Sequence, residues 1–156
     1  MSRKAFELLI LFALLAGTLA VGFVASQVTV PNIPGWYAGL HKPGFNPPNW
    51  LFAPVWTSLY VLMAVAAWRV WRKAGLRPLA LYALQLALNG AWSFIFFGAH
   101  TIGFALIEIV LLLAAVLATL GDFWGKDRLA GLFFVPYAGW VLFAGVLNAA
   151  IWRLNG

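Results

Sequence analysis

Residues 5–26 read AFELLILFALLAGTLAVGFVAS, and Glu7 is the only charged residue among them. A helix needs about 20 predominantly apolar residues to cross the hydrocarbon core of a bilayer. The apolar core of a secretory signal peptide is shorter, about 7–15 residues, and no small-x-small cleavage site ends this stretch. We therefore predict a retained membrane-spanning helix over residues 5–26, preceded by Arg3 and Lys4.

The composition of the whole chain also indicates a membrane protein. Of its 156 residues, 64% are hydrophobic and 9% are charged, whereas soluble domains have roughly 45–50% apolar and about 25% charged residues. So few polar side chains cannot cover a soluble domain, and such high hydrophobicity excludes a disordered chain. The absence of cysteine excludes disulfides, thiolate catalysis and cysteine-ligated metal centres.

Four further apolar stretches have the length of membrane spans. The five predicted spans are residues 5–26, 51–71, 79–97, 104–123 and 129–152. No domain boundary or internal repeat interrupts them. The sequence therefore predicts a single all-α domain, residues 1–156, that forms an integral membrane bundle of five transmembrane helices.

The connection between the first two spans, residues 27–49, holds five prolines and three glycines. Proline lacks an amide donor and biases the preceding residue toward extended backbone, so this segment is predicted to be a loop. Loops of this length are usually functional or disordered, and Trp36, Tyr37 and Phe45 argue against disorder. We predict an ordered Pro-rich lid with one short helical turn near residues 36–40.

The basic residues are distributed unevenly between the two ends of the predicted bundle. Eight of the ten lysines and arginines lie on the side of the N-terminus, and only Lys42 and Arg153 lie on the other. Cytoplasmic loops of membrane proteins are enriched in lysine and arginine, so the N-terminus is predicted to be cytoplasmic. Because membrane topology accounts for the net charge of +6, we expect no nucleic-acid partner.

Three predicted spans place aromatic and polar side chains on one helical face, because residues three or four positions apart share a face. The three stripes are Trp56, Tyr60 and Met63; Gln85, Asn89, Trp92 and Phe96; and Tyr137, Trp140, Ala144 and Asn148. One interpretation is a cavity beneath the lid, where a flat apolar ligand stacks on the rings while Tyr60, Asn89, Asn148 and the indole N–H groups orient it.

The alternative interpretation of these stripes is packing between helices. For the tryptophans at the span ends, anchoring at the membrane interface is the better interpretation. These are Trp36, Trp50, Trp71, Trp124 and Trp152.

Glu108 is the one carboxylate well within a predicted span, about 10 Å beyond the nearest turn at 1.5 Å per residue. Ionisable residues inside a membrane are costly and usually functional, but a proton relay needs several of them. We expect a structural role for Glu108, either neutral or paired with Gln85 or another buried amide. His41 and His100 are the only histidines and lie in loops, so neither a metal site nor catalytic residues are predicted.

Small residues recur in the third span at Ala83, Ala87 and Ala91, with Gly90 beside them. Such a face lets two helices approach closely. It could be a seam within the bundle or the interface of a homodimer, and the sequence leaves both open.

Several motifs resemble one known family. The lid and second span read WYAGLHKPGFNPPNW (residues 36–50) and FAPVWTSLY (52–60), and later stretches read QLALNGAW (85–92), VPYAGW (135–140) and LN (147–148). Over nearly its whole length the chain resembles the translocator protein family, also called tryptophan-rich sensory proteins or peripheral-type benzodiazepine receptors. The most specific element is WY-x-x-L-x-KP-x-x-x-PP followed by W-x-x-LY.

This resemblance implies a five-helix membrane bundle, often dimeric, in the cell membrane of a bacterium. Its central pocket, capped by the first loop, would bind porphyrins, haem-like tetrapyrroles and synthetic aromatic ligands, with no separate cofactor. The pocket positions implied are Tyr37, Pro47, Pro48, Trp56, Asn89, Trp92, Phe96, Trp140 and Ala144. Bacterial members are linked to tetrapyrrole, light and oxygen responses, so a sensor, regulator or transporter of tetrapyrroles is expected.

The resemblance also implies alternatives. Some members are ascribed a light-dependent breakdown of porphyrin that involves tryptophans matching Trp56 and Trp140, and a scaffold for a partner protein is a further alternative. Mitochondrial members handle cholesterol through a late motif of Leu or Val, then Tyr, then Lys or Arg. Val146 and Arg153 are present here, but Ala149 and Ala150 stand where the tyrosine would be, so cholesterol is a weak expectation.

Overall fold

A computed structural model describes residues 2–156 of the chain and confirms the predicted membrane architecture. The helices are α1 (Arg3–Asn32), α2 (Asn49–Ala74), α3 (Leu79–Ser93), α4 (Ile102–Lys126) and α5 (Arg128–Asn155). A π-helical turn, η2 (Phe94–Gly98), continues α3. All five helices, α3 together with η2, are long and apolar enough to cross a bilayer, and residues 2–156 contain no strand.

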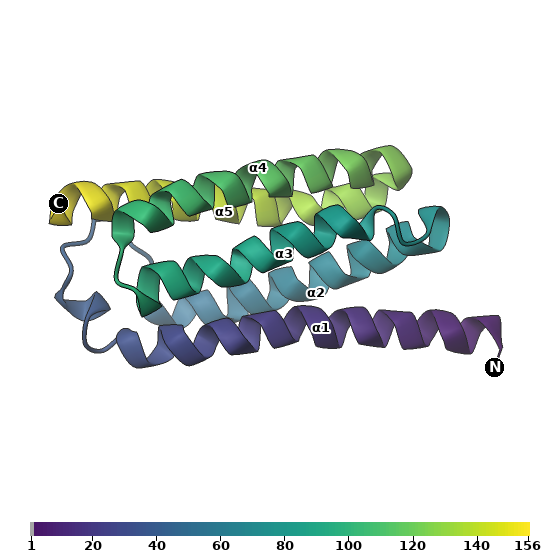
Figure 1. Cartoon of the computed structure of the whole chain (residues 1–156), viewed down its shortest axis with the longest axis horizontal. Coiled ribbons are helices and arrows are strands. Elements are labelled where there is room, and N and C mark those ends of the chain that lie inside the picture. The colour runs from purple at the N-terminus through teal and green to yellow at the C-terminus, as the bar shows by residue number, and fades with distance from the viewer. Residues whose placement is uncertain (1) are drawn as a thin grey trace.

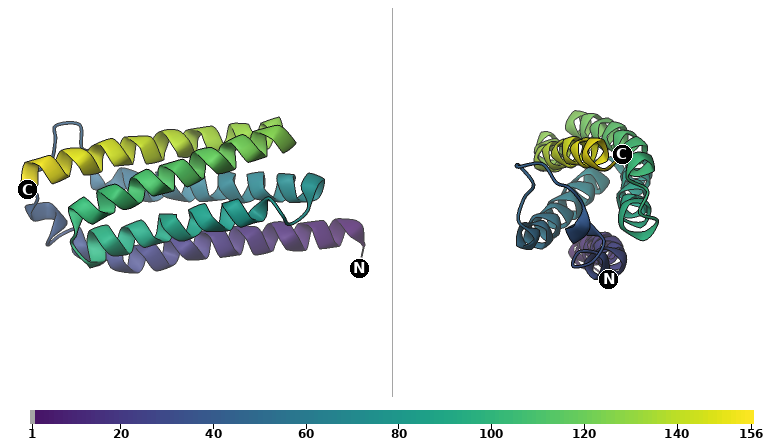
Figure 2. Two further views of the ribbon diagram at one scale, coloured as in Figure 1. Left: turned by 45° about the horizontal axis from the view of Figure 1, so that its top comes forward. Right: turned by 90° about the vertical axis from the view of Figure 1, so that its left-hand side faces the viewer.

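The five helices run along one common direction and form a closed ring (Figures 1 and 2). Going round the ring, α1 packs on α2, α2 on α5, α5 on α4, α4 on α3, and α3 on α1. The N-terminus lies at one end of the bundle and the C-terminus at the other, as an odd number of crossings requires (Figure 1).

The first helix is longer than predicted, because it continues through residues 27–32. Pro31 lies in its last turn, where the lost amide donor costs one hydrogen bond. Polar side chains stabilise this end instead: the Thr29 hydroxyl donates to the Ala25 carbonyl at 3.0 Å, and the Asn32 amide donates to the Val28 carbonyl at 2.8 Å. The lid therefore spans residues 33–48 rather than 27–49.

The lid crosses the end of the bundle that holds the C-terminus (Figure 2, right). Its predicted helical turn is confirmed as a short 3-10 helix, η1 (Tyr37–Gly39). At the start of α2, Pro48 occupies the N-cap position and makes no side-chain cap hydrogen bond.

Two hydrophobic clusters fill the ring at different levels. The larger one, towards the N-terminal end of the bundle, includes Tyr82, Phe123 and Phe134. The smaller one lies beneath the lid and includes Tyr37, Phe96 and Phe97. Between these clusters the bundle leaves room for the cavity described next.

Candidate functional site

A cavity of about 530 Å³ lies among the helices beneath the lid. All five helices contribute to its wall. Nine of the eleven residues predicted to bind ligand line it: Tyr37, Trp56, Tyr60, Asn89, Trp92, Phe96, Trp140, Ala144 and Asn148. The other two, Pro47 and Pro48, are not lining residues: Pro47 is buried within the lid and Pro48 precedes α2.

Aromatic rings from the lid, α1, α2, α3, η2 and α5 line the cavity. Trp92 and Phe96 of α3 and η2 are stacked, with centroids 4.8 Å apart and planes inclined by 19°. On the other side, the rings of Trp56 and Trp140 are nearly perpendicular, at 89° and 6.5 Å. The arrangement offers both flat faces and ring edges, which are the two surfaces that aromatic ligands prefer to contact.

A hydrogen-bonded chain joins three helices beside the cavity. The Tyr60 hydroxyl donates to Asn89 Oδ1 at 2.7 Å, and Asn89 Nδ2 donates to the Tyr137 oxygen at 2.9 Å. The Tyr137 hydroxyl then donates to Gln85 Oε1 at 2.7 Å. Because buried polar groups need partners, this chain fixes α2, α3 and α5 in register and holds Tyr60 and Asn89 at the cavity wall.

Asn148 organises a second polar contact. Its side-chain oxygen accepts from the Trp92 indole at 3.1 Å, while its nitrogen donates to the Ile102 carbonyl at 3.0 Å. By contrast, the indole N–H groups of Trp56 and Trp140 have no hydrogen-bond partner among residues 2–156. They are therefore available as donors to a ligand that carries an acceptor.

Two parts of the wall were not anticipated from the sequence. The π-helical turn brings the consecutive residues Phe96 and Phe97 both inward, with 1% and 8% of their surfaces exposed. A regular helical period separates neighbours by about 100°, so the stripe pattern could identify only Phe96. The second part is α1, where the close approach of Gly22 to the Tyr60 ring leaves no space for a larger side chain.

The cavity opens sideways between α1 and α2. Phe23 and Val30 of α1 line it yet are 67% and 61% exposed, and Ala53 and Thr57 of α2 also combine lining with exposure. This surface belongs to the apolar exterior of the bundle. The opening therefore faces the acyl chains of the bilayer.

Polar contacts within the lid fix its shape. Lys42 Nζ donates to the carbonyls of Tyr37 and Leu40 at 2.7 and 2.9 Å and lies 4.8 Å from the centre of the Tyr37 ring. The Tyr37 hydroxyl donates to Asn46 Oδ1 at 2.9 Å. Burial raises the pKa of Tyr37, and the hydrogen bond to Asn46 offsets part of that rise, so the hydroxyl stays a neutral donor.

Two further contacts fasten the lid to the helix ends. Trp36 stacks on the His100 ring at 4.3 Å with an interplanar angle of 13°. The side chain of Asn155, near the end of α5, bonds both the amide and the carbonyl of His41, at 3.0 and 2.9 Å. The lid is thus attached to α5 and to the corner between α3 and α4.

The sequence match extends over these elements. Residues 12–153 match the TspO/MBR family. The chain belongs to the TspO/MBR family.

Relatives in the TspO/MBR family come from different domains of life. The chain is 46% identical over 125 residues to Protein CrtK of Rhodobacter capsulatus, covering 77% of this chain and 78% of the relative. It is 40% identical over 152 residues to Tryptophan-rich protein TspO of Archaeoglobus fulgidus, covering 96% of this chain and 99% of the relative. It is 42% identical over 139 residues to Translocator protein of Homo sapiens, covering 85% and 82%.

Glu108 of this TspO/MBR protein is only 7% exposed, and neither carboxylate oxygen has a hydrogen-bond partner among residues 2–156. Of the predicted alternatives for Glu108, pairing with Gln85 or another buried amide is wrong. Gln85 accepts from Tyr137 and directs its nitrogen to the Met63 sulfur at 3.8 Å. Glu108 is therefore a costly buried group that no hydrogen bond within the described chain compensates.

Replacing Glu108 by leucine is expected to raise the stability of this TspO/MBR protein by about 1–3 kcal/mol, because the variant no longer buries an unpaired polar group. Thermal unfolding in a mild detergent measures the change. Glu7→Leu is the matched control, since Glu7 is paired with Arg3 and Arg72 and its loss should lower the midpoint. A fall for Glu108→Leu would instead mean that the carboxyl group holds a stabilising partner.

The stripe of small residues on α3 serves partly as a seam within the TspO/MBR bundle. Val21 of α1 packs close to Gly90, so this position needs a small residue. Ala83 and Ala87 are exposed and Ala91 is half-buried, beside a shallow apolar groove between α1 and α3. A homodimer through Ala83, Ala87 and Ala91 remains a prediction.

Proposed function

We propose that this membrane protein binds a planar, largely apolar aromatic ligand of the porphyrin or tetrapyrrole class in the cavity beneath its lid. The observation that supports this most strongly is the pair of perpendicular indole rings, Trp56 and Trp140, with unpartnered N–H groups. Together with the stacked Trp92 and Phe96, they provide flat contact area and hydrogen-bond donors within one cavity.

The residues of the cavity wall favour binding over hydrolytic or acid–base chemistry. Within residues 2–156, the lining residues include no Lys, Arg, His, Asp, Glu or Cys. Recognition would therefore rest on stacking and on uncharged polar groups, which are the indole N–H groups, the side-chain amides and the hydroxyl groups of the lining. The propionates of a porphyrin would have to lie towards the lid, at the membrane surface, because the cavity interior and the acyl chains at its sideways opening both disfavour charge.

Relatives named Tryptophan-rich sensory protein and Translocator protein agree with a sensing or transport role. We propose that ligand occupancy of the cavity is the event that is sensed or transported. The protein would lie in the cell membrane of a bacterium with its N-terminus in the cytoplasm, a placement supported by the concentration of basic residues at that end.

Porphyrin titration of the intrinsic tryptophan fluorescence tests the proposal. Trp140→Ala is expected to weaken binding about tenfold, within the roughly 0.5–1.5 kcal/mol that an aromatic pair contributes beyond its buried area. Trp50→Ala is the control, because Trp50 is 72% exposed and lies outside the cavity lining. Equal affinities for Trp140→Ala and the unaltered protein would place the ligand elsewhere.

A further inference from the structure

The end of the bundle that holds the N-terminus carries a strong excess of positive charge. Its basic residues are Arg3, Lys4, Arg69, Arg72, Lys73, Arg77, Lys126 and Arg128. Its acidic residues are Glu7, Asp122 and Asp127. Eight positive side chains against three negative ones leave a surplus of five at the level where lipid headgroups meet the helix ends.

Most of the carboxylates at this end are used within the fold. Asp127 pairs with Arg69 and Lys73, and Asp122 pairs with Lys126. Glu7 differs from them because it holds two arginines from different helices. Its Oε1 lies 3.1 Å from Arg3 Nε of α1, and its Oε2 lies 3.0 Å from Arg72 Nε of α2.

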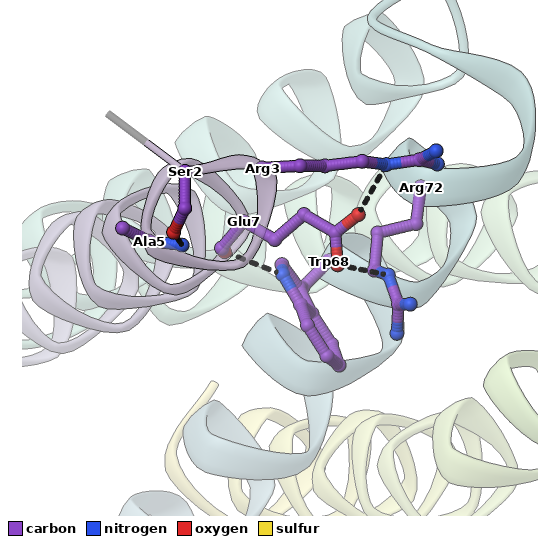
Figure 3. Close-up of polar contacts among 6 residues, drawn as sticks. All are labelled: Ser2, Arg3, Ala5, Glu7, Trp68 and Arg72. Atoms are coloured by element: carbon purple, nitrogen blue, oxygen red, sulfur yellow. Dashed lines mark hydrogen bonds and ion pairs between the residues drawn. The ribbon is translucent and has the colours of Figure 1, made fainter.

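Figure 3 shows the contacts of Glu7 with the two arginines and with Trp68. The Trp68 indole donates to the backbone carbonyl of Glu7 at 2.8 Å, and this hydrogen bond links α2 to α1. The Arg72 guanidinium carbon lies 4.6 Å from the centre of the Trp68 ring, in a cation–π contact. Two guanidinium groups are thereby held beside one carboxylate at the junction of two helices.

Each of these guanidinium groups approaches the Glu7 carboxylate with its Nε. Their Nη groups have no protein partner among residues 2–156, although each guanidinium has five N–H donors in a planar fork. A planar fork matches the geometry of the oxygens of a phosphate. Because Glu7 carries one negative charge and the two arginines carry two positive charges, the cluster keeps one net positive charge. The exposed Lys4 in the first turn of α1 adds another positive charge.

The surroundings favour a lipid phosphate over a soluble one. Phe6 packs on Trp71, with ring centres 5.8 Å apart, and is 44% exposed; Trp71 precedes Arg72 in sequence. Further along α1, Leu8 and Leu9 are 60% and 53% exposed on its outer surface. A headgroup at the arginines would have its acyl chains lying along this apolar surface.

We propose that the Nη groups of Arg3 and Arg72, held in place by Glu7 and Trp68, bind the phosphate of an anionic phospholipid. The site lies at the opposite end of the bundle from the lid and is independent of the cavity. It would anchor α1, which forms one side of the cavity opening, to the lipids of one leaflet.

Native mass spectrometry of the full chain in detergent, titrated with phosphatidylglycerol or phosphatidylcholine, tests this site. Each arginine that hydrogen-bonds the phosphate should contribute about fivefold or more to the affinity for anionic lipid, because charge-assisted hydrogen bonds are stronger than diffuse attraction. The double variant Arg3→Gln/Arg72→Gln should therefore bind phosphatidylglycerol about 25-fold more weakly, with phosphatidylcholine binding unchanged. Arg77→Gln/Arg128→Gln is the matched control, because it removes the same charge from the same end, and its affinity should change less than about twofold.

Equal losses in the two double variants would overturn the proposal, because they would show diffuse attraction instead of a built site. Arg72→Lys keeps the charge and the pairing with Glu7 but removes the fork, and should lower phosphatidylglycerol affinity at least about twofold. Unchanged affinity in that variant would also overturn the proposal. In a separate experiment, inorganic phosphate is added as a competitor. If it displaces phosphatidylglycerol at equal concentration, the site binds soluble anions and the lipid assignment is wrong.

Discussion

Replacing Ala144 by phenylalanine is expected to weaken porphyrin binding by about 10- to 100-fold while leaving the bundle folded. Ala144 lines the cavity one turn beyond Trp140, and its small side chain leaves the space that a planar guest would occupy. A phenyl ring would fill part of the cavity of about 530 Å³, so the ligand would have to displace protein groups. Overpacking of this kind costs about 1–3 kcal/mol, which corresponds to the expected loss in affinity.

Tryptophan fluorescence quenching measures this loss, and the thermal unfolding midpoint shows whether the fold survives. Val146→Phe is the matched control, since Val146 lies on the same helix but is 53% exposed on the outer surface. It should bind porphyrin like the unaltered protein. If Ala144→Phe binds with unchanged affinity, the ligand does not occupy this cavity.

The second large effect is expected for Asp127→Asn, which should lower stability at neutral pH by about 2 kcal/mol. Asp127 is buried in the turn between α4 and α5. Its Oδ1 accepts hydrogen bonds from Arg69 Nη2 at 3.4 Å and from the Leu129 amide at 3.1 Å, and its Oδ2 forms an ion pair with Arg69 Nε at 2.8 Å. Hydrogen bonds to charged groups contribute about 1.5–3 kcal/mol. For a chain of this size such a loss lowers the unfolding midpoint by roughly 4–8 °C.

The pH dependence of this effect follows from the pKa of Asp127. Burial alone would raise that pKa, but the hydrogen bonds from Arg69 and Leu129 and the Arg69 charge together hold it below its ordinary value. A carboxyl group whose pKa falls on folding stabilises the protein above its unfolded pKa of about 3.9. The difference between Asp127→Asn and the unaltered protein should be full at pH 7 and disappear as pH falls through the folded pKa.

Asp122→Asn is the control for this measurement. Asp122 pairs with Lys126 one turn away on the surface of α4, and exposed pairs of this kind contribute about 0.3–0.5 kcal/mol. A midpoint shift as large as that of Asp127→Asn would show that the surplus of positive charge, and not the buried contact with Arg69, explains the loss.

Hydropathy and charge were sufficient to predict the membrane architecture, because crossing a bilayer requires long apolar helices. The positions of the five spans are confirmed. The helix ends were less predictable. Pro31 indicated a loop, but the side chains of Thr29 and Asn32 stabilise a further turn of α1. Local hydrogen bonds of this kind cannot be recognised from the pattern of apolar residues in the sequence.

The helical period also located most of the cavity wall. The stripes on α2, α3 and α5 converge because each combines rings with an amide or hydroxyl that must find a partner inside the bundle. The wall formed by α1 was not predictable in this way, because most of its lining residues are apolar and belong to a helix that is apolar on all sides. Phe97 was missed because the π-helical turn changes the angle between successive side chains.

The sideways opening between α1 and α2 has a consequence for how affinity should be measured. A guest that enters from among acyl chains responds to its concentration in the membrane phase, and not to the amount dissolved in buffer. Occupancy should then follow the partition coefficient of the guest and the ratio of lipid to protein. Titrations at several lipid contents should converge on one curve when the abscissa is moles of guest per mole of lipid.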